Sequence, residues 1–323
     1  MSQYQNSTVV IAKQPGAVKS VFDALNLPEI LKDKKNILIK VNLRAAAVDD
    51  YTSCAITSFE VARELTTALL ALGKNIIIAE GTSSKIMTKK AIERSGFRKL
   101  ENDKIKVVNL NTQLTRRVEI PASPLKFLEI YKVVFEADYI ISLPVMKTHT
   151  ATLASLSMKN LMGLASETSI HKIHLKGLHK SIAQLAKAIS PHLSLIDATQ
   201  AMEGTGPVLG TCVKLDTLIA GFNPVTTDSV ATQMMGFFPQ EISHLKIGES
   251  LGIGPIKPNN IIGELKIHSF KKPSHGLAAD MYNYQIFNWL VSKKIIHWLV
   301  YDKFYFIIKK MLKLFRHKDE SRK

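Results

Sequence analysis

A strand, a helix, a glycine and a second strand follow one another from Asn36, and this order constrains the fold more than any other feature of the chain. "NILIKVNL" (36–43) is a short β-rich run, and "TSFEVARELTTALLALGKN" has apolar residues at helical spacing that end at Gly73. "NIIIAEGTSS" then reads as a second buried strand. Two strands joined through a helix are usually parallel neighbours. The sequence therefore predicts a βαβ unit within a parallel sheet.

The segments that follow extend this alternation. "KIMTKKAIERSGF" predicts a second helix, "KIKVVNLN" a third strand and "TTDSVATQMMGF" a later helix. "VVFEADYIISLPVM" predicts another strand that ends at Pro144. The alternation runs from about residue 8 to about residue 268. We therefore expect one α/β domain over residues 1–270, with a mostly parallel sheet and helices on both faces.

The last 44 residues differ in composition from the rest. Residues 280–323 hold ten Lys/Arg and four Asp/Glu, a net charge of +6, and aromatic residues alternate with lysine pairs. Their longest uncharged stretch has twelve residues, too short to span a bilayer. This pattern predicts a basic amphipathic helical tail that lies on an anionic membrane through Trp289, Trp298 and Phe304. The alternative is a helix packed on the domain or on a second subunit.

The formal net charge of +16 indicates an acidic partner. Nucleic acid is the least favoured partner, because the basic residues are dispersed or lie in the tail and no recognisable nucleic-acid module is present. Two cysteines, Cys54 and Cys212, exclude a disulfide framework and a cysteine-only metal or iron–sulfur site. The N-terminus lacks the pattern of a secretory signal. We expect a cytoplasmic protein that is peripheral on the inner face of the cell membrane where the tail binds lipid.

Polar residues follow the predicted strands, and ligands of open parallel sheets bind at the carboxyl ends of strands. The first and second strands are followed by Lys40, Asn42, Glu80 and Gly81, and "YIISLPVM" by Lys147 and His149. Glu203, Gly204 and Gly206 come after "LSLID", in a glycine-rich loop whose backbone N–H groups could approach an anion. We expect these residues to converge on one cleft that binds an anionic or carboxylated small molecule.

The stretch from Met146 to His179 holds four of the ten histidines and two lysines beside Thr, Ser and Asn. Lys159 and Asn160 would open a helix whose N-terminal amides, with Lys147 and His149, form a cationic wall. The candidate catalytic residues are Lys147, His149, Lys159, His174 and Glu203, with a histidine and Glu203 moving protons. Each could instead be a surface amine or a satisfied loop residue. Asp228 is a further ligand-binding candidate, although a structural place near a helix N-terminus explains it more simply.

These residues carry a resemblance to a known family. "ILIKVNL", "ISLPVMKTH", "SMKNLMGL", "LIDATQAMEGTGPVLG", "NPVTTDSVA" and "IGESLGIG" occur in that order. Over about residues 36–263 the chain resembles the prokaryotic family catalogued as domain of unknown function 362. Many members carry ferredoxin-like modules, so the resemblance implies redox chemistry. This chain departs from them because it lacks clustered cysteines, so we expect no iron–sulfur cluster in it and a separate redox partner.

A second resemblance concerns "KNLMGLASETSIHKIH" (159–174). Its order is similar to the catalytic stretch of nickel-pincer lactate racemases, in which a lysine holds the cofactor covalently and a histidine ligates nickel. Here the spacing is one residue shorter, and Met162 stands where proline is expected. The resemblance singles out Lys159 and His174 without implying nickel, and the cofactor stays unknown.

Two function classes follow from the sequence. One is an enzyme of redox or isomerase type, in which Lys40, Lys147 and Lys159 hold an anionic substrate. The other is a non-catalytic, membrane-peripheral protein that binds a phosphorylated or anionic ligand.

Overall fold

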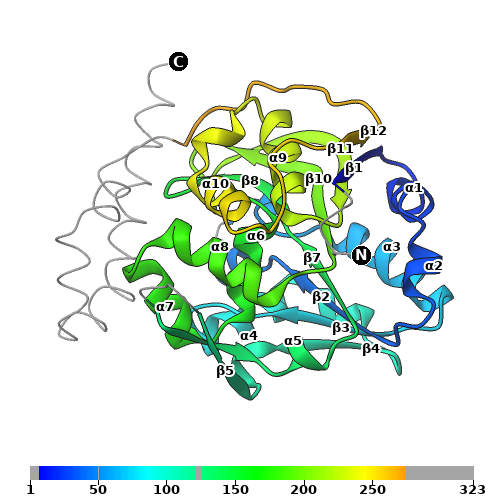
Figure 1. Ribbon diagram of the computed structural model, residues 1–323. Coiled ribbons are helices and arrows are strands. Elements are labelled where there is room, and N and C mark those ends of the chain that lie inside the picture. The colour runs from blue at the N-terminus through cyan, green and yellow to red at the C-terminus, as the bar shows by residue number, and fades with distance from the viewer. Residues whose placement is uncertain (1–6, 50, 121–124, 274–323) are drawn as a thin grey trace. The chain divides into compact units, whose positions relative to one another are not determined.

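The computed structural model describes residues 7–49, 51–120 and 125–273, and Figure 1 shows their arrangement. A mixed ten-stranded sheet forms the centre, in the order β12-β1-β11-β10-β7-β2-β3-β4, with β8 on β10 and β9 on β8. Its strands are β1 (Thr8–Lys13), β2 (Asn36–Val41), β3 (Asn75–Glu80), β4 (Ile105–Asn109), β7 (Tyr139–Leu143), β8 (Val145–His149), β9 (Leu153–Ser155), β10 (Leu193–Glu203), β11 (Thr211–Gly221) and β12 (Asn260–Ile262). A separate hairpin pairs β5 (Thr115–Glu119) with β6 (Phe127–Tyr131).

The predicted α/β fold and mostly parallel sheet are confirmed. β2 pairs in parallel with β3 and with β7, β4 adds to β3, and β10 adds to β7. The mixed character comes from β11, which is antiparallel to both β1 and β10. The long β10–β11 hairpin was not foreseen, because antiparallel pairing depends on partners that no local pattern identifies.

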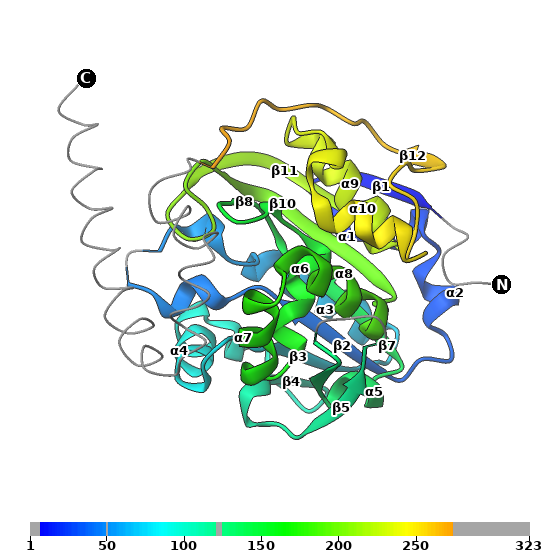
Figure 2. The ribbon, with the colours of Figure 1, turned by 60° about the vertical axis from the view of Figure 1, so that its left-hand side comes forward.

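Helices cover both faces of the sheet (Figure 2). Two separate apolar clusters lie beneath them. One face carries the first four helices: α1 (Ala17–Ala24), α2 (Leu27–Leu31), α3 (Phe59–Ala71) and α4 (Lys85–Ser95). The other carries α6 (Ser157–Asn160), α7 (Glu167–Leu175), α8 (Leu178–Ile189), α9 (Pro224–Met234) and α10 (Ser243–Ser250). Within the described ranges, no helix is long and apolar enough to cross a bilayer.

One strand begins later than predicted. The residues Val133–Glu136 form a short helix, α5, and not the start of a strand. β7 ends at Leu143, directly before Pro144, as predicted, and a further strand, β8, begins at Val145, while the Pro144 carbonyl accepts a hydrogen bond from the Asp197 amide at 2.8 Å. Proline removes a donor but keeps its acceptor, so the ladder to β10 resumes after one residue. Lys147 and His149 therefore lie on a strand and not in a loop.

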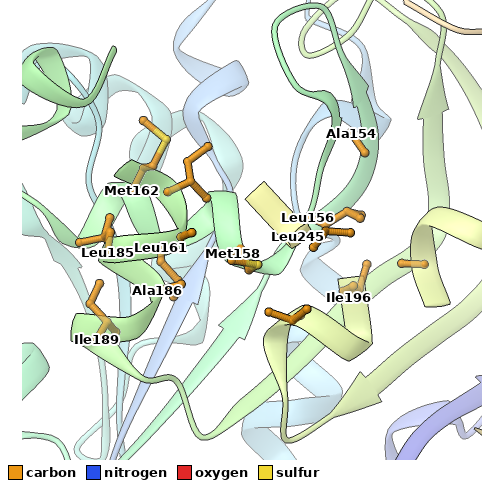
Figure 3. Close-up of a cluster of buried hydrophobic side chains, with 14 of the residues drawn as sticks. Ala154, Leu156, Met158, Leu161, Met162, Leu185, Ala186, Ile189, Ile196 and Leu245 are labelled. Atoms are coloured by element: carbon orange, nitrogen blue, oxygen red, sulfur yellow. The ribbon is translucent and has the colours of Figure 1, made fainter. Parts of the chain in front are cut away.

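The short helix α6 is anchored by apolar side chains on the second face. Met158 and Leu161 are fully buried, and Figure 3 shows them among Leu185, Ile189 and Ile196. Burying a side chain of this size contributes about 1.5–3 kcal/mol. This packing fixes the turn that carries Lys159.

A disulfide joins Cys54 to Cys212 across 158 residues, with 5.6 Å between the Cα atoms. Cys54 lies in the 3₁₀ turn η2 (Ser53–Ala55), and Cys212 lies on β11. Two cysteines are too few for a framework, but they form this single crosslink. The predicted tail over residues 280–323 lies outside the described residues.

A buried ion pair joins the two central strands. Lys40 Nζ lies 2.5 Å from Glu80 Oε1, and both side chains are almost fully buried. Glu80 also accepts hydrogen bonds from the amides of Gly81, at 2.8 Å, and Leu43. Asn160 adds its amide oxygen at 3.4 Å from Lys40 Nζ and donates from Nδ2 to the Lys40 carbonyl at 2.8 Å. The pair is thus enclosed by protein hydrogen bonds.

We predict that Glu80→Gln lowers the free energy of unfolding by about 3–5 kcal/mol, because it leaves the Lys40 ammonium buried without a counter-charge. The matched control is Glu60→Gln, which removes the same charge from the exposed pair with Arg63 and should cost about 0.5 kcal/mol or less. Urea unfolding of the three proteins measures both. Equal losses in the two variants would contradict a stabilising role for the buried pair.

Candidate functional site

Lys147 lies beyond the carboxyl ends of β2 and β3, on the strand β8. Its side chain is 4% exposed, and Nζ donates a hydrogen bond to the Ala55 carbonyl at 2.8 Å. Burial, together with the charges of Lys159 and Arg44, lowers the pKa of Lys147 to about 7 against the opposing effect of Glu80. The amine is therefore near the midpoint of its titration at neutral pH.

Lys159, on α6, is half-buried near Lys147 and Arg44. Burial and the neighbouring charge of Arg44 lower its pKa to about 8. The charge of Lys159 in turn lowers the pKa of Lys147 and of four histidines, which are His149, His174, His179 and His244. We call these six residues the lysine–histidine cluster. Lys159 is the member that acts on all the others.

The four histidines of the cluster are neutral at pH 7. Burial, with the charge of Lys159, lowers the pKa of His174 to about 3 and the pKa of His149 well below its usual value. His179 and His244 face each other, with 3.0 Å between their Nδ1 atoms and stacked rings. One Nδ1 of this pair must carry the proton and the other must accept it. Neutral imidazoles can accept or relay protons, so the cluster offers acid–base groups beside ammonium groups.

Within the described ranges, neither Lys147 nor Lys159 forms an ion pair with a carboxylate. Glu80, which lies near Lys147, is held by Lys40. Asn42, at the end of β2, has a buried Oδ1 with no hydrogen-bond partner among the described residues. The lysine amines thus lack a matching negative charge, and an anion would supply one.

Asp228 positions α6 because its carboxylate binds the N-terminal amides of this helix. Its two carboxylate oxygens accept hydrogen bonds from the amides of Ser157, at 2.8 Å, and Met158, at 2.9 Å. Burial raises the pKa of Asp228 to about 7, against these two hydrogen bonds. The amides expected to face a ligand were those of Lys159 and Asn160, and the Asn160 amide donates to the Leu156 carbonyl at 3.0 Å. Lys159 does not open α6 but lies in its last turn.

Lys40, Glu80 and Asn160 come together as predicted, but inside the buried network and not on an open wall. Gly81 belongs to the same place, since a Cβ on Gly163 would meet the Gly81 carbonyl and Lys40. This close approach of two backbones holds η5 (Leu161–Leu164) against the end of β3. These four predicted residues therefore hold the elements of the site in place from within the buried network.

Glu203 lies at the end of β10, where its carboxylate contacts Lys271. Oε2 accepts from the Lys271 amide at 2.9 Å, and Oε1 lies 3.6 Å from Nζ. Gly204 has φ +72° and accepts a hydrogen bond from Thr148 Oγ1 at 2.9 Å, and a Cβ on Gly206 would meet Thr148. Both glycines thus pack the turn against β8. Among the described residues, the Glu203 carboxylate is thus engaged by Lys271, and neither of these two contacts involves a histidine of the cluster.

Sequence reasoning did not select Arg44 or His244 for the site. Arg44 begins the turn η1 (Arg44–Ala47), and its charge acts on Lys147, Lys159 and His174. His244 lies in the first turn of α10. The place of Arg44 directly after a strand could have indicated it, but no local signal links His244 to His179.

The described residues contain no group of three or more His, Cys, Asp or Glu side chains placed to hold one metal ion.

Comparisons with known proteins identify a relative, a structural neighbour and a family. A curated relative, the thylakoid-associated protein sll1697 of Synechocystis sp., is 29% identical over 164 residues, which are 47% of this chain and 51% of the relative. The match therefore spans about half of that relative's length. The lactate racemase apoprotein of Thermoanaerobacterium thermosaccharolyticum is structurally similar at a TM-score of 0.47 and 18% identity, over 77% of this chain and 57% of that one. The family model described as "Domain of unknown function (DUF362)" matches residues 37–233, more than half of the chain, and the protein belongs to that family.

Proposed function

We propose that this protein binds a small anionic molecule, bearing a carboxylate or a phosphate, at the lysine–histidine cluster. The supporting observation is that Lys159 lowers the pKa of one further lysine and four histidines, while no carboxylate pairs with either lysine in the described part of the chain. Lysine ammonium groups that are buried without a counter-charge oppose folding unless an anion offsets them. Binding of an anion is the use that best accounts for it.

The same arrangement supports catalysis of proton transfer on the bound anion. Lys147 and Lys159, with Arg44, would hold the negative group, and neutral His149 or His174 would accept a proton from it. Perturbed pKa values grouped in one place are typical of active sites. An enzyme of redox or isomerase type fits this division of roles. A binding protein without catalysis would need the lysines but not the histidines.

We predict that Lys159→Ala weakens the binding of inorganic phosphate about tenfold or more, since one charge-assisted hydrogen bond contributes about 1.5–3 kcal/mol. Lys147→Ala should have a similar effect. The control is Lys19→Ala, which removes an 81%-exposed amine paired with Asp23. Isothermal titration at pH 6.5 measures all four proteins. Unchanged affinity in both cluster variants would reject the site.

The depressed pKa of Lys147 also predicts a pH dependence of stability. Its folded value of about 7 lies below the ordinary 10.5, so the unfolded chain binds more protons between these values and stability rises with pH in that window. Lys147→Met removes the buried amine. The free energy of unfolding of this variant should therefore exceed that of the wild type at pH 6.5. This excess should be about 1–3 kcal/mol larger at pH 6.5 than at pH 9.5.

Urea unfolding at the two pH values measures this difference, and Lys19→Met serves as the exposed control. A gain in Lys147→Met that is the same at both pH values would contradict the lowered pKa.

We also propose that the protein attaches to anionic membranes through the basic aromatic segment from Met281 to Phe315. The segment's composition supports this, as does the name of the thylakoid-associated relative. The full chain should sediment with anionic vesicles at low salt and be released at high salt, because screening weakens the lysine contribution of about 1 kcal/mol each. A chain ending at Ala279 is the control. Equal sedimentation of the two chains would exclude the segment as the anchor.

A further inference from the structure

The Cys54–Cys212 disulfide connects two segments that meet beside Lys147. Cys54 is 1% exposed and lies in the connection between β2 and α3, whereas Cys212 is exposed on β11. The bond thus has one sulfur in the interior and one that a reagent in solution can reach. Access to one sulfur is what thiol–disulfide exchange requires.

Hydrogen bonds between the same two segments are few and long. The Thr52 amide donates to the Val208 carbonyl at 3.3 Å, and Thr52 Oγ1 donates to the Gly210 carbonyl at 3.2 Å. Ser53 Oγ lies 3.9 Å from Cys212 Sγ. These contacts are weak beside a covalent bond, so the disulfide is the main tether of the turn η2 to the β10–β11 hairpin.

The tethered turn supplies the hydrogen-bond acceptor of Lys147. Ala55 directly follows Cys54, and its carbonyl accepts from Lys147 Nζ at 2.8 Å. The buried residues Cys54 and Ala55 also pack with Met202, the strand partner of Lys147. Arg44 lies on the same connection, ten residues earlier. The disulfide therefore keeps the Ala55 carbonyl within hydrogen-bond distance of the Lys147 amine and keeps this amine shielded from solvent.

We propose that Cys54–Cys212 is a thiol–disulfide exchange site whose reduction releases the η2 turn from Lys147. A dithiol reductant attacks Cys212 Sγ as its thiolate, which forms a mixed disulfide and expels Cys54 as a thiolate that takes up a proton. The second thiol of the reductant then displaces Cys212, so that the reductant leaves as an oxidised disulfide and the protein holds two thiols. Two electrons pass from the dithiol to the protein.

Reduction uncovers the Lys147 amine and removes its carbonyl partner. The Lys147 amine is then held less firmly, so its affinity for an anion falls. This consequence alone rests on the proposed function. The exchange itself does not depend on it.

The test compares the full-length protein after treatment with diamide and after treatment with dithiothreitol. Acetylation of individual lysines by acetic anhydride is followed by mass spectrometry, and Lys147 should react at least five times faster in the reduced protein. Lys74 is the matched internal control, since it is 6% exposed and donates to the Leu31 carbonyl at 2.6 Å, away from the disulfide. A Cys54→Ser/Cys212→Ser double variant should behave like the reduced protein and not respond to dithiothreitol.

Each contrary result overturns the proposal. Two free thiols after diamide treatment would show that the bond does not form. Equal Lys147 acetylation in both states would show that the turn stays in place. A parallel increase at Lys74 would show general loosening of the fold. Phosphate titration then separates the exchange site from the proposed anion binding. Faster acetylation of Lys147 alone on reduction, without phosphate binding in either state, would keep the exchange site and reject the proposed function.

Discussion

The buried ion pair between Lys40 and Glu80 is the interaction on which the site depends. A charge removed from water must be matched, and here both partners are also hydrogen-bonded by backbone groups at the ends of β2 and β3. Asn160 binds both the Lys40 amine and the Lys40 carbonyl, so it locks the last residue of α6 to the centre of the sheet. Because Lys159 precedes Asn160, the position of its amine is set by the most buried polar contacts of the fold.

Asp228 performs the same task at the other end of α6. Its carboxylate holds the first two amides of the helix, and the side chains of Met158 and Leu161 fill the core between these ends. The helix is thus fixed by the buried carboxyl group of Asp228 at its start and by the buried side-chain amide of Asn160 at its end. This support matters because Lys159 repels its basic neighbours, and such repulsion would displace a loosely held turn.

Local patterns were sufficient for much of the fold. The strands that begin at Asn36 and Asn75, and the helix that ends at Gly96 with φ +76°, follow from apolar periodicity and from a glycine that tolerates a left-handed conformation. The site was foreseen less well. Asp228 finds its partners 71 and 70 residues away, and His244 meets a histidine 65 residues earlier. No periodicity encodes such pairings, so the sequence alone does not link His244 to His179 or Asp228 to α6.

In this cluster the lysines would bind the anion, and the histidines would transfer protons. The lysines lose protons near neutrality, and the histidines are neutral there, because burial and mutual repulsion oppose every positive charge. A bound anion reverses both effects: it favours the ammonium forms and raises the pKa of the imidazoles towards the range in which they exchange protons. By linkage, any ligand that raises these pKa values must bind more tightly as protons are added. Ligand affinity and proton-transfer capacity would therefore increase together, which couples the arrival of an anionic substrate to the chemistry proposed for it.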